Sequence, residues 1–460
     1  MTPPYRVEAI ALHQVGVFDD VAIDFKPIRS VERDANKAEI HLLTGPNGCG
    51  KSTLLYALAE IFDRNHSNSL IRRRFRGSKS HVDFLFAGKT GTYGIRHSHG
   101  DLLHSGLTCP NRYGRYTIQI NESSSGCFFG HGEGSGQELF EYKKTSQSFQ
   151  FNNVHAQIRF SYAAFAYSGQ RTLRDTPLSA IQQITASPFE AALSFDNSVR
   201  PQVLLQWIAN NRTQSALAKA DGDNKAAQTY DQALNRITTL IHGICDLELE
   251  FRLERSPLAV TVRVNGDIIH FDGLPDGLKS IISWVADLSL RLEAIPWQEE
   301  RDVFSQPIIL LLDEVDIHLH PKWQRRILPA IQTLLPNAQI FVSTHSPFVV
   351  GSVEDAWVYR LPESGSGTRT IEGTPSGAGK SYRLILDEVF GIDDEFDVET
   401  EMLFDEFYRL KELFLQAPQS PQTLLEAANK LAARGEEAAL IVSRELRQIT
   451  RITGQELLLA

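Results

Sequence analysis

Eight residues near the start of the chain have the types and spacing of a phosphate-binding loop. Residues 45–52 read Gly-Pro-Asn-Gly-Cys-Gly-Lys-Ser, which fits the pattern G-x-x-x-x-G-K-[ST]. Glycines in such a loop let successive backbone N–H groups turn toward phosphate oxygens at the start of a helix. An apolar run precedes the loop at residues 40–43, and a helical pattern follows it at residues 53–60. This strand–loop–helix context predicts a site for a nucleoside triphosphate.

Two side chains of this loop have expected roles of their own. Lys51 is expected to reach the β- and γ-phosphates, and the Ser52 hydroxyl is expected to bind Mg²⁺. The other candidate nucleotide-binding residues here are Gly45, Asn47, Gly48, Gly50 and Thr53. The predicted cofactors are therefore ATP and Mg²⁺.

Two later apolar runs end in residues that could complete the chemistry. Residues 307–314 read Pro-Ile-Ile-Leu-Leu-Leu-Asp-Glu, the pattern of a buried parallel strand that ends in two carboxylates. Asp313 is the expected Mg²⁺ ligand, and Glu314 is expected to orient and polarise the attacking water. A second such strand, at residues 338–343, leads to His345, which is placed to contact the γ-phosphate or that water.

Composition sets the class of protein around these residues. The chain has 460 residues, of which 42% are hydrophobic and 22% charged, and its net charge is −10. These values are ordinary for a globular protein with two or three domains, and they give no sign of general nucleic-acid binding. Four scattered cysteines form no C-x-x-C pair, and no apolar run is long enough to span a membrane. Without a signal-peptide pattern at the N-terminus, we expect a cytoplasmic protein with no membrane contact.

The expected fold is α/β, with a mostly parallel core sheet that is interrupted by insertions. More than 250 residues separate Lys51 from Asp313, which a head split by insertions can accommodate. The pattern predicts strands at 82–86, 116–120 and 148–151, and mostly helix from Leu178 to about Leu247. The expected parts are a head with its phosphate loop at 1–63, a β-rich insertion at 64–155, a second head segment at 156–180, a helical insertion at 181–247, a third head segment at 248–380, and a C-terminal helical region at 381–460.

Four further motifs resemble those of the ABC-type ATPases of the SMC, RecF and OLD-like group. Residues 312–324 resemble their Walker B motif and D-loop, and residues 343–347 resemble their switch-histidine motif. Gln170 lies where that group carries its Q-loop, and residues 274–280 resemble its signature motif. Within the group, residues 382–391 and the helices after them resemble the ATPase subunits, called PtuA, of Septu anti-phage defence systems.

This resemblance implies a head that dimerises, or forms larger oligomers, around nucleotide. Lys51 of one subunit and the 274–280 segment of another would enclose each ATP, with Asp276, Gly277 and Lys279 as candidate contacts. The resemblance also implies an HNH nuclease subunit, similar to PtuB, as the partner. The expected function is ATP binding and hydrolysis that regulates this nuclease in anti-phage defence.

The signature motif departs from its family pattern at Pro275, where a serine is usual. Proline has neither a hydroxyl nor an N–H to offer the γ-phosphate. We therefore expect slow hydrolysis, with ATP acting largely as a regulatory ligand.

Alternative functions remain open from the sequence. They are the ATPase of another defence system, similar to AriA of PARIS or associated with a retron, that holds a toxin effector; a RecF-like DNA-repair ATPase; and a nucleotide-gated scaffold without turnover. Nuclease activity in this chain is not expected, because His97, His99, His104 and His131 lack a matching Asp/Asn set. DNA is a further candidate partner, through the basic run at residues 72–76, for which a solvated helix face is an equal alternative.

Overall fold

The chain forms two compact units, Met1–Ile385 and Leu386–Ala460, which are described separately. The computed structural model describes residues 5–28, 37–63, 71–89, 91–98, 127–130, 137–150, 158–169, 177–195, 198–363, 368–377, 379–392, 394–416 and 420–459. The predicted strand at 116–120 and the candidate residue Gln170 lie outside these ranges.

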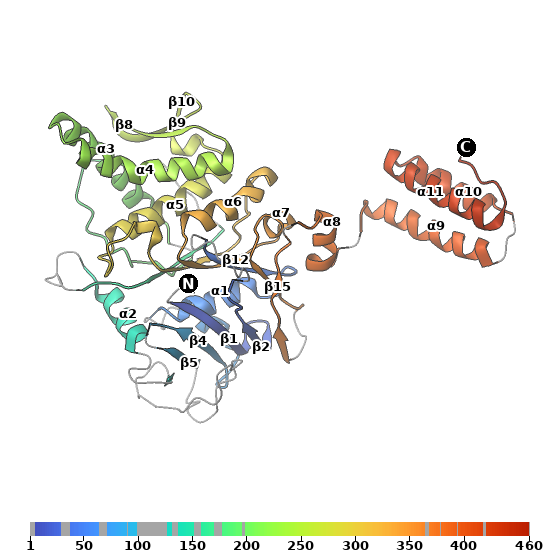
Figure 1. Ribbon diagram of the computed structural model, residues 1–460, viewed down its shortest axis with the longest axis horizontal. Helices are drawn as coiled ribbons and strands as arrows, with labels where there is room; N and C mark the ends of the chain where they lie inside the picture. The colour runs from blue at the N-terminus through green and yellow to red at the C-terminus, as the bar shows by residue number, and fades with distance from the viewer. Residues whose placement is uncertain are drawn as a thin grey trace. The chain divides into compact units, whose positions relative to one another are not determined.

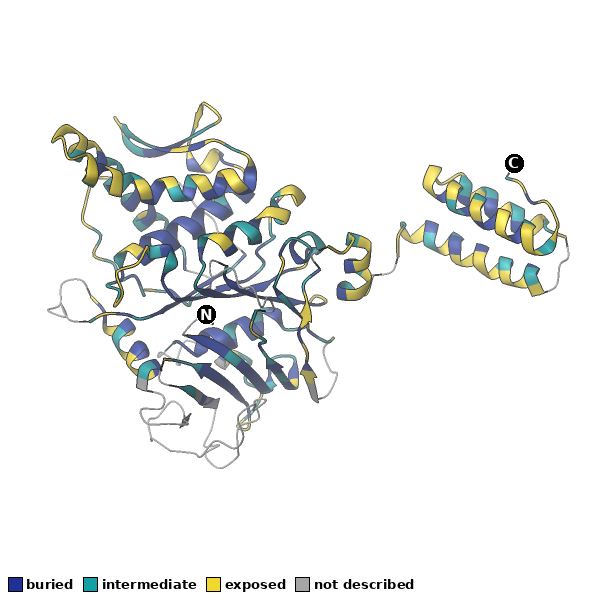
Figure 2. Cartoon of the chain, in the orientation of Figure 1, coloured by how far each residue is buried: buried dark blue, intermediate teal, exposed yellow. Residues whose placement is uncertain are grey.

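A six-stranded sheet forms the centre of the first unit, in the order β15-β13-β3-β12-β11-β7. Its neighbouring strands pair in parallel, except that β15 is antiparallel to β13. Every residue of β3, β7, β11 and β12 is buried, as Figure 2 shows in dark blue. Burial on both faces explains why these strands are continuous apolar runs. The strands are β3 (Glu39–Thr44), β7 (Ala163–Tyr167), β11 (Ile308–Leu312), β12 (Ala338–Ser343), β13 (Trp357–Arg360) and β15 (Thr374–Pro375).

Helices cover both faces of this core sheet. Figure 1 shows α1 on one face and α5 and α6 on the other, with α3 and α4 stacked beyond α5 and α6. Helix α5 is buried along almost its whole length, since it lies between the sheet and the outer helices. The helices of this unit are α1 (Lys51–Glu60), α2 (Gln137–Ser148), α3 (Pro201–Ala220), α4 (Asn224–Cys245), α5 (Asp276–Ala294), α6 (Pro321–Leu334), α7 (Pro347–Val350) and α8 (Tyr382–Ile385).

Two further sheets complete the first unit. One has the order β14-β2-β1-β4-β5-β6 and is antiparallel apart from the β14–β2 pair. The other is a three-stranded antiparallel sheet in the order β10-β9-β8. Their strands are β1 (Arg6–Val15), β2 (Phe18–Asp24), β4 (His81–Ala87), β5 (Thr92–Ser98), β6 (Cys127–Gly130), β8 (Leu249–Arg255), β9 (Leu258–Val264), β10 (Asp267–Ile269) and β14 (Thr368–Ile371).

A buried polar network joins the β1 sheet to the core sheet. The Glu39 carboxylate accepts from Arg6 at 2.8 Å and from Gln339 at 2.9 Å, and it contacts His41 at 2.8 Å. The backbone N–H of Val7 in turn donates to the Gln339 carboxamide oxygen at 2.7 Å. Burial disfavours the Glu39 carboxylate, but His41 and Arg6 outweigh it and lower its pKa to about 2. The two sheets are therefore held together by an ionised carboxylate at the start of β3.

Two local predictions were wrong for the residues that the structure describes. Residue 148 ends helix α2, and 149–150 form no strand. Burial at Leu139, Tyr142, Lys143 and Ser146 follows the three- and four-residue spacing of a helix, which polar residues had obscured. The predicted helix from Leu178 begins only at Pro201, and the described residues before it form turns and irregular backbone around Pro188.

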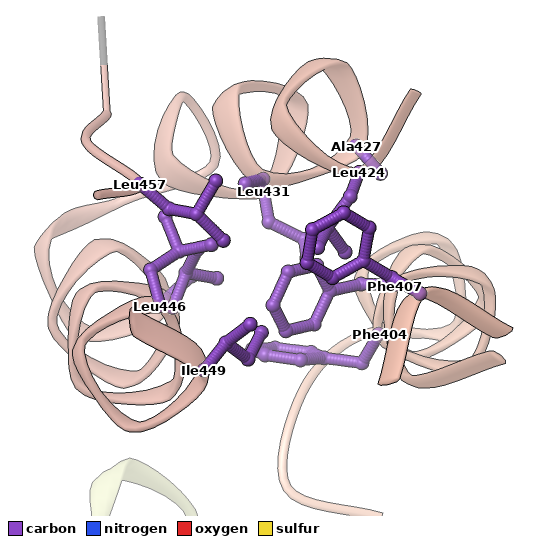
Figure 3. Close-up of a cluster of buried hydrophobic side chains, with 12 residues drawn as sticks. Phe404, Phe407, Leu424, Ala427, Leu431, Leu446, Ile449 and Leu457 are labelled. Carbon is purple, nitrogen blue, oxygen red and sulfur yellow. The ribbon is translucent and has the colours of Figure 1, made fainter. Parts of the chain in front are cut away.

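The second unit packs three helices around an apolar cluster. They are α9 (Val398–Gln416), α10 (Gln422–Ala432) and α11 (Glu436–Thr453), and a π-helical turn at Leu386–Phe390 precedes them. Figure 3 shows Phe404 and Phe407 of α9 facing Leu431 of α10 and Ile449 of α11. The spacing of apolar residues in this region predicted these helices, and the cluster gives the reason for the spacing.

The predicted fold class is confirmed. The chain is α/β with a mostly parallel core sheet, a helical insertion formed by α3 and α4, and a helical C-terminal tail. Among the described residues, no helix is both long and apolar enough to cross a membrane.

Candidate nucleotide site

The 45–52 loop joins the end of β3 to the start of α1, and its glycines adopt conformations that other residues avoid. Gly45, Gly48 and Gly50 have φ values of 142°, 77° and 100°. At Gly50 a Cβ atom would lie 2.4 Å from the Phe18 ring, so the turn between β1 and β2 packs directly against the loop. The loop shape therefore depends on glycine for both backbone conformation and space.

The Lys51 side chain folds back onto the 45–52 loop. Its ammonium donates to the carbonyl oxygens of Gly45 and Pro46, both at 3.0 Å, and the residue is 7% exposed. The first turn of α1 contains no acidic residue, and no side chain caps it within the described part of the chain. A cation and a helix N-terminus thus lie together at the end of β3, which suits phosphate.

The remaining loop candidates differ in exposure. Asn47 and Gly48 are exposed, and Ser52 is half-buried. Thr53 is buried, and its side chain faces the turn between β1 and β2, where a Cβ at Gly16 would lie 3.0 Å from it. Thr53 therefore supports the loop from the protein side.

The carboxylates at the end of β11 are joined to the end of β12 by one hydroxyl. Ser343 donates to Asp313 Oδ1 at 2.5 Å and accepts from the backbone N–H of Glu314 at 2.7 Å. Parallel pairing sets Leu312 opposite Val342, so the two strands end side by side. We did not predict a role for Ser343. Its position as the last strand residue before Thr344-His345 was the available signal.

Asp313 and Ser52 suit a magnesium ion. Asp313 is 6% exposed and has one oxygen engaged by Ser343, and Ser52 is half-buried at the start of α1. One carboxylate and one hydroxyl are oxygen ligands that Mg²⁺ prefers, and phosphate oxygens and water would complete its octahedron. The residues present therefore fit the ion that the sequence predicts.

Glu314 has a constrained backbone. Its φ is 48°, in the left-handed region that few non-glycine residues adopt. Gly169, which follows β7, lies against it, because a Cβ at Gly169 would be 2.7 Å from Glu314 Cβ and 2.9 Å from its carboxylate. The Glu314 side chain therefore packs directly against Gly169, where a larger residue would displace it.

His345 is exposed and follows the end of β12. Partial burial lowers the pKa of its imidazole, the Lys51 ammonium lowers it further, and the Asp316 and Asp313 carboxylates oppose both effects. These effects together favour the neutral imidazole. Residues that follow β3, β11 and β12 in the chain thus lie near one another at one edge of the sheet. Asp316 was not among the predicted site residues.

The 274–280 segment forms the start of α5. Pro275 is the N-cap residue, with φ −57° and ψ 142°, and it provides no side-chain cap. The Asp276 side chain is 72% exposed and lies 3.5 Å from the Lys279 ammonium. A Cβ at Gly277 would lie 2.5 Å from the His318 carbonyl oxygen, so this helix start rests on the turn that follows Glu314.

The basic run after α1 is tied to the loop region. Arg74 stacks on the Tyr56 ring of α1 at 4.5 Å, and Arg76 donates to the Phe18 carbonyl at 2.6 Å and to Asp19 at 2.5 Å. Arg72–Arg74 is a short 3₁₀ helix. Arg76 therefore braces the turn between β1 and β2 that packs against the 45–52 loop, and Arg74 packs on α1.

Two family models match the two halves of this site. A family model described as "AAA domain, putative AbiEii toxin, Type IV TA system" matches residues 148–351, and one described as "ABC transporter" matches residues 28–81. The chain is 23% identical to "Retron Vc95 probable ATPase" of Vibrio cholerae serotype O1 biovar El Tor, over 78% of this chain and 76% of that protein. It is 23% identical to "Septu protein PtuA" of Bacillus thuringiensis, over 80% of this chain and 82% of that protein.

Among solved structures, the chain matches an Smc head bound to the C-winged helix domain of ScpA. The TM-score is 0.43 and the identity 12%, with 80% of this chain and 98% of that chain covered.

Proposed function

We propose that the chain is an ABC-type P-loop ATPase that binds ATP with Mg²⁺, hydrolyses it slowly and regulates a nuclease in anti-phage defence. The observation that carries this proposal is the meeting of Lys51, Asp313 and His345 at one edge of the core sheet, with Glu314 beside them. These are the residue types that triphosphate hydrolysis requires.

Each side chain has a separate role in the proposed reaction. Lys51 and the N–H groups of the loop would hold the phosphates, and Asp313 and Ser52 would hold Mg²⁺, which would offset phosphate charge. Glu314 accepts a proton from the attacking water, and its fixed backbone sets the direction of attack. The neutral His345 donates a hydrogen bond to the γ-phosphate or to that water.

We propose that the 274–280 segment acts in trans. Asp276 is largely exposed at a helix N-terminus, a position from which it could approach nucleotide held by a second subunit. Pro275 supplies no donor there, which is why slow turnover is part of the proposal. Self-association around ATP, as a dimer or a larger oligomer, follows from this arrangement.

The proposed partner is an HNH nuclease. The support is the likeness to a protein named Septu PtuA and the PtuA-like tail after residue 381. A retron-associated role, with a toxin effector in place of the nuclease, is the second candidate, because the retron relative matches over a similar length. An HNH reading frame beside the gene and a stable complex of the two purified products would favour the first over the second.

The decisive experiment measures ATP binding and hydrolysis in parallel. Glu314→Gln should bind a fluorescent ATP analogue as the wild type does and lose about 100-fold in turnover, since it can no longer accept a proton. Glu354→Gln, an exposed carboxylate elsewhere on the head, is the matched control and should leave both values unchanged. Turnover that is unaffected by Glu314→Gln would contradict the assignment.

A further inference from the structure

One glutamine links two parts of the site that the chain sequence keeps apart. Gln324 lies in the first turns of α6, and its carboxamide N–H groups donate to the carbonyl oxygens of Leu319 at 2.9 Å and Asp316 at 3.3 Å. Its carboxamide oxygen accepts from the Ser346 hydroxyl at 2.7 Å. Both ends of one amide are thus engaged, and they face different loops.

Ser346 fixes the loop that carries His345 (residues 344–346). While its hydroxyl donates to Gln324, it accepts from the N–H groups of Phe348 at 3.1 Å and Val349 at 3.3 Å, so it also caps α7. On the other side of His345, the Thr344 N–H donates to the Leu43 carbonyl oxygen of β3 at 3.1 Å. His345 is therefore held between the core sheet and Gln324.

The other loop is the turn at residues 316–319, which lies near His345 on one side and contacts α5 on the other. The Asp316 carboxylate influences the His345 imidazole, and Oδ1 of Asp316 is buried without a hydrogen-bond partner. Backbone bonds from Ile317 to Glu314 and from Leu319 to Asp316 keep the turn tight. At its far side, His318 meets Gly277 at the start of α5 so closely that no Cβ would fit.

We propose that Gln324 is a positioning residue that holds the His345 loop and the 316–319 turn in one arrangement. Movement of His345 on its contact with nucleotide then reaches Gly277, and with it the segment proposed to meet a second subunit. A single amide is enough to couple the two segments because backbone hydrogen bonds hold the turn and the loop, and because His318 already lies in close contact with Gly277. The inference rests on the proposed function, which assigns the nucleotide to His345.

The test compares two glutamines of the same helix. Gln324→Met keeps the length of the side chain and removes all three hydrogen bonds. Gln332→Met is the matched control, since Gln332 is 5% exposed and donates to the Ala38 carbonyl oxygen at 3.1 Å, away from both loops. We expect Gln324→Met to lower kcat about tenfold with unchanged affinity for a fluorescent ATP analogue, and Gln332→Met to change neither.

A double-mutant cycle separates the link from a general loss of stability. Ser346→Ala should lower kcat similarly, and the double variant should be no slower than the slower single variant, because both changes break one connection. Additive losses, or an equal effect of Gln332→Met, would overturn the proposal.

Hydrogen exchange tests the link without nucleotide. Gln324→Met should speed exchange at residues 316–319 and 344–350, and Gln332→Met should not. Unchanged exchange in these segments would also overturn the inference. A wild-type chain that does not bind the ATP analogue would refute the proposed function instead. The exchange result would then still show whether Gln324 holds residues 316–319 and the His345 loop together.

Discussion

The two units of the chain are built on different principles. The first unit buries charged side chains, among them Glu39 with Arg6, Asp83 with Arg96, and Asp287 with Arg291. The second unit has an apolar core of Phe, Leu, Ile, Val and Ala, although Glu445, which is buried, pairs with Lys411. Their surface charges also differ, because residues 386–460 contain sixteen acidic and seven basic residues, and so carry most of the net charge of −10.

This difference suggests that buried charges serve to fix geometry in the head, whereas apolar packing serves only to hold the tail together. Buried ion pairs contribute little net stability, but they fix the geometry of the groups around them, and leaving one partner alone is strongly unfavourable. In the head they join β1 to β3 and β4 to β5, and one pair lies within α5. The tail needs only to keep three helices together, and an amphipathic pattern is enough for that.

The largest expected effect is on the tail. Phe407→Ala should destabilise the second unit by about 4 kcal/mol, because a fully buried ring leaves a cavity in a small core. Leu440→Ala is the control, since Leu440 is 70% exposed on α11. Thermal unfolding followed together with binding of an ATP analogue should show loss of the tail and intact binding. Loss of nucleotide binding would mean that the two units are not independent.

A change at the base of β3 should act on the head through charge. Glu39→Gln should lower the free energy of unfolding of the head by about 3 kcal/mol at pH 7, because the Arg6 guanidinium then stays buried without the Glu39 carboxylate.

The same residue predicts a pH dependence. The pKa of Glu39 falls from 4.5 to about 2 on folding, so its stabilisation is complete above pH 4.5 and is lost as the pH falls toward 2. Urea unfolding of the head at several pH values should show this slope in the wild type and a weaker slope in Glu39→Gln. Parallel slopes would argue against an ionised Glu39.

Substitutions at two loop glycines should weaken ATP binding while the head still folds. Gly50→Ala should weaken ATP binding by about 100-fold, because its Cβ meets the Phe18 ring and its φ is left-handed. Gly48→Ala carries only the backbone strain, since no atom lies within 4 Å of its Cβ, and should lose about fivefold. Titration with a fluorescent ATP analogue measures both, and equal losses would show that the packing against Phe18 is unimportant.

The last expected effect is a gain in turnover. Pro275→Ser should raise turnover about tenfold, because a serine hydroxyl at this N-cap can donate to a γ-phosphate and can also cap α5. The steady-state ATPase rate measures the first effect, and the melting temperature of the head measures the second. A more stable but no faster variant would mean that the segment does not meet nucleotide.

Sequence reasoning succeeded where local geometry sets the structure. The glycine spacing of residues 45–52, the apolar runs at 307–312 and 338–343, and the periodicity from Met402 to Phe414 each depend on near neighbours in the chain. It failed at residues 137–148, where polar side chains hid a helix, and at residues 178–200, where the described residues form turns and irregular backbone instead of the expected helix.

The candidate site itself was only partly predictable. That Asp313, Glu314 and His345 follow strand ends was visible in the sequence. The Ser343 hydroxyl bridge, the contact of Gly169 with Glu314, and the amide of Gln324 were not, since each joins residues that come together only through strand pairing or helix packing.

The sequence by itself determined the phosphate loop, the class of fold and the helices of the tail, because backbone conformation and amphipathic spacing act over a few residues. Only the tertiary structure decided how the ends of β3, β11 and β12 converge and how the 316–319 turn supports α5. The reason is physical: these contacts lie between segments up to about 300 residues apart, where parallel pairing of buried strands sets the distance.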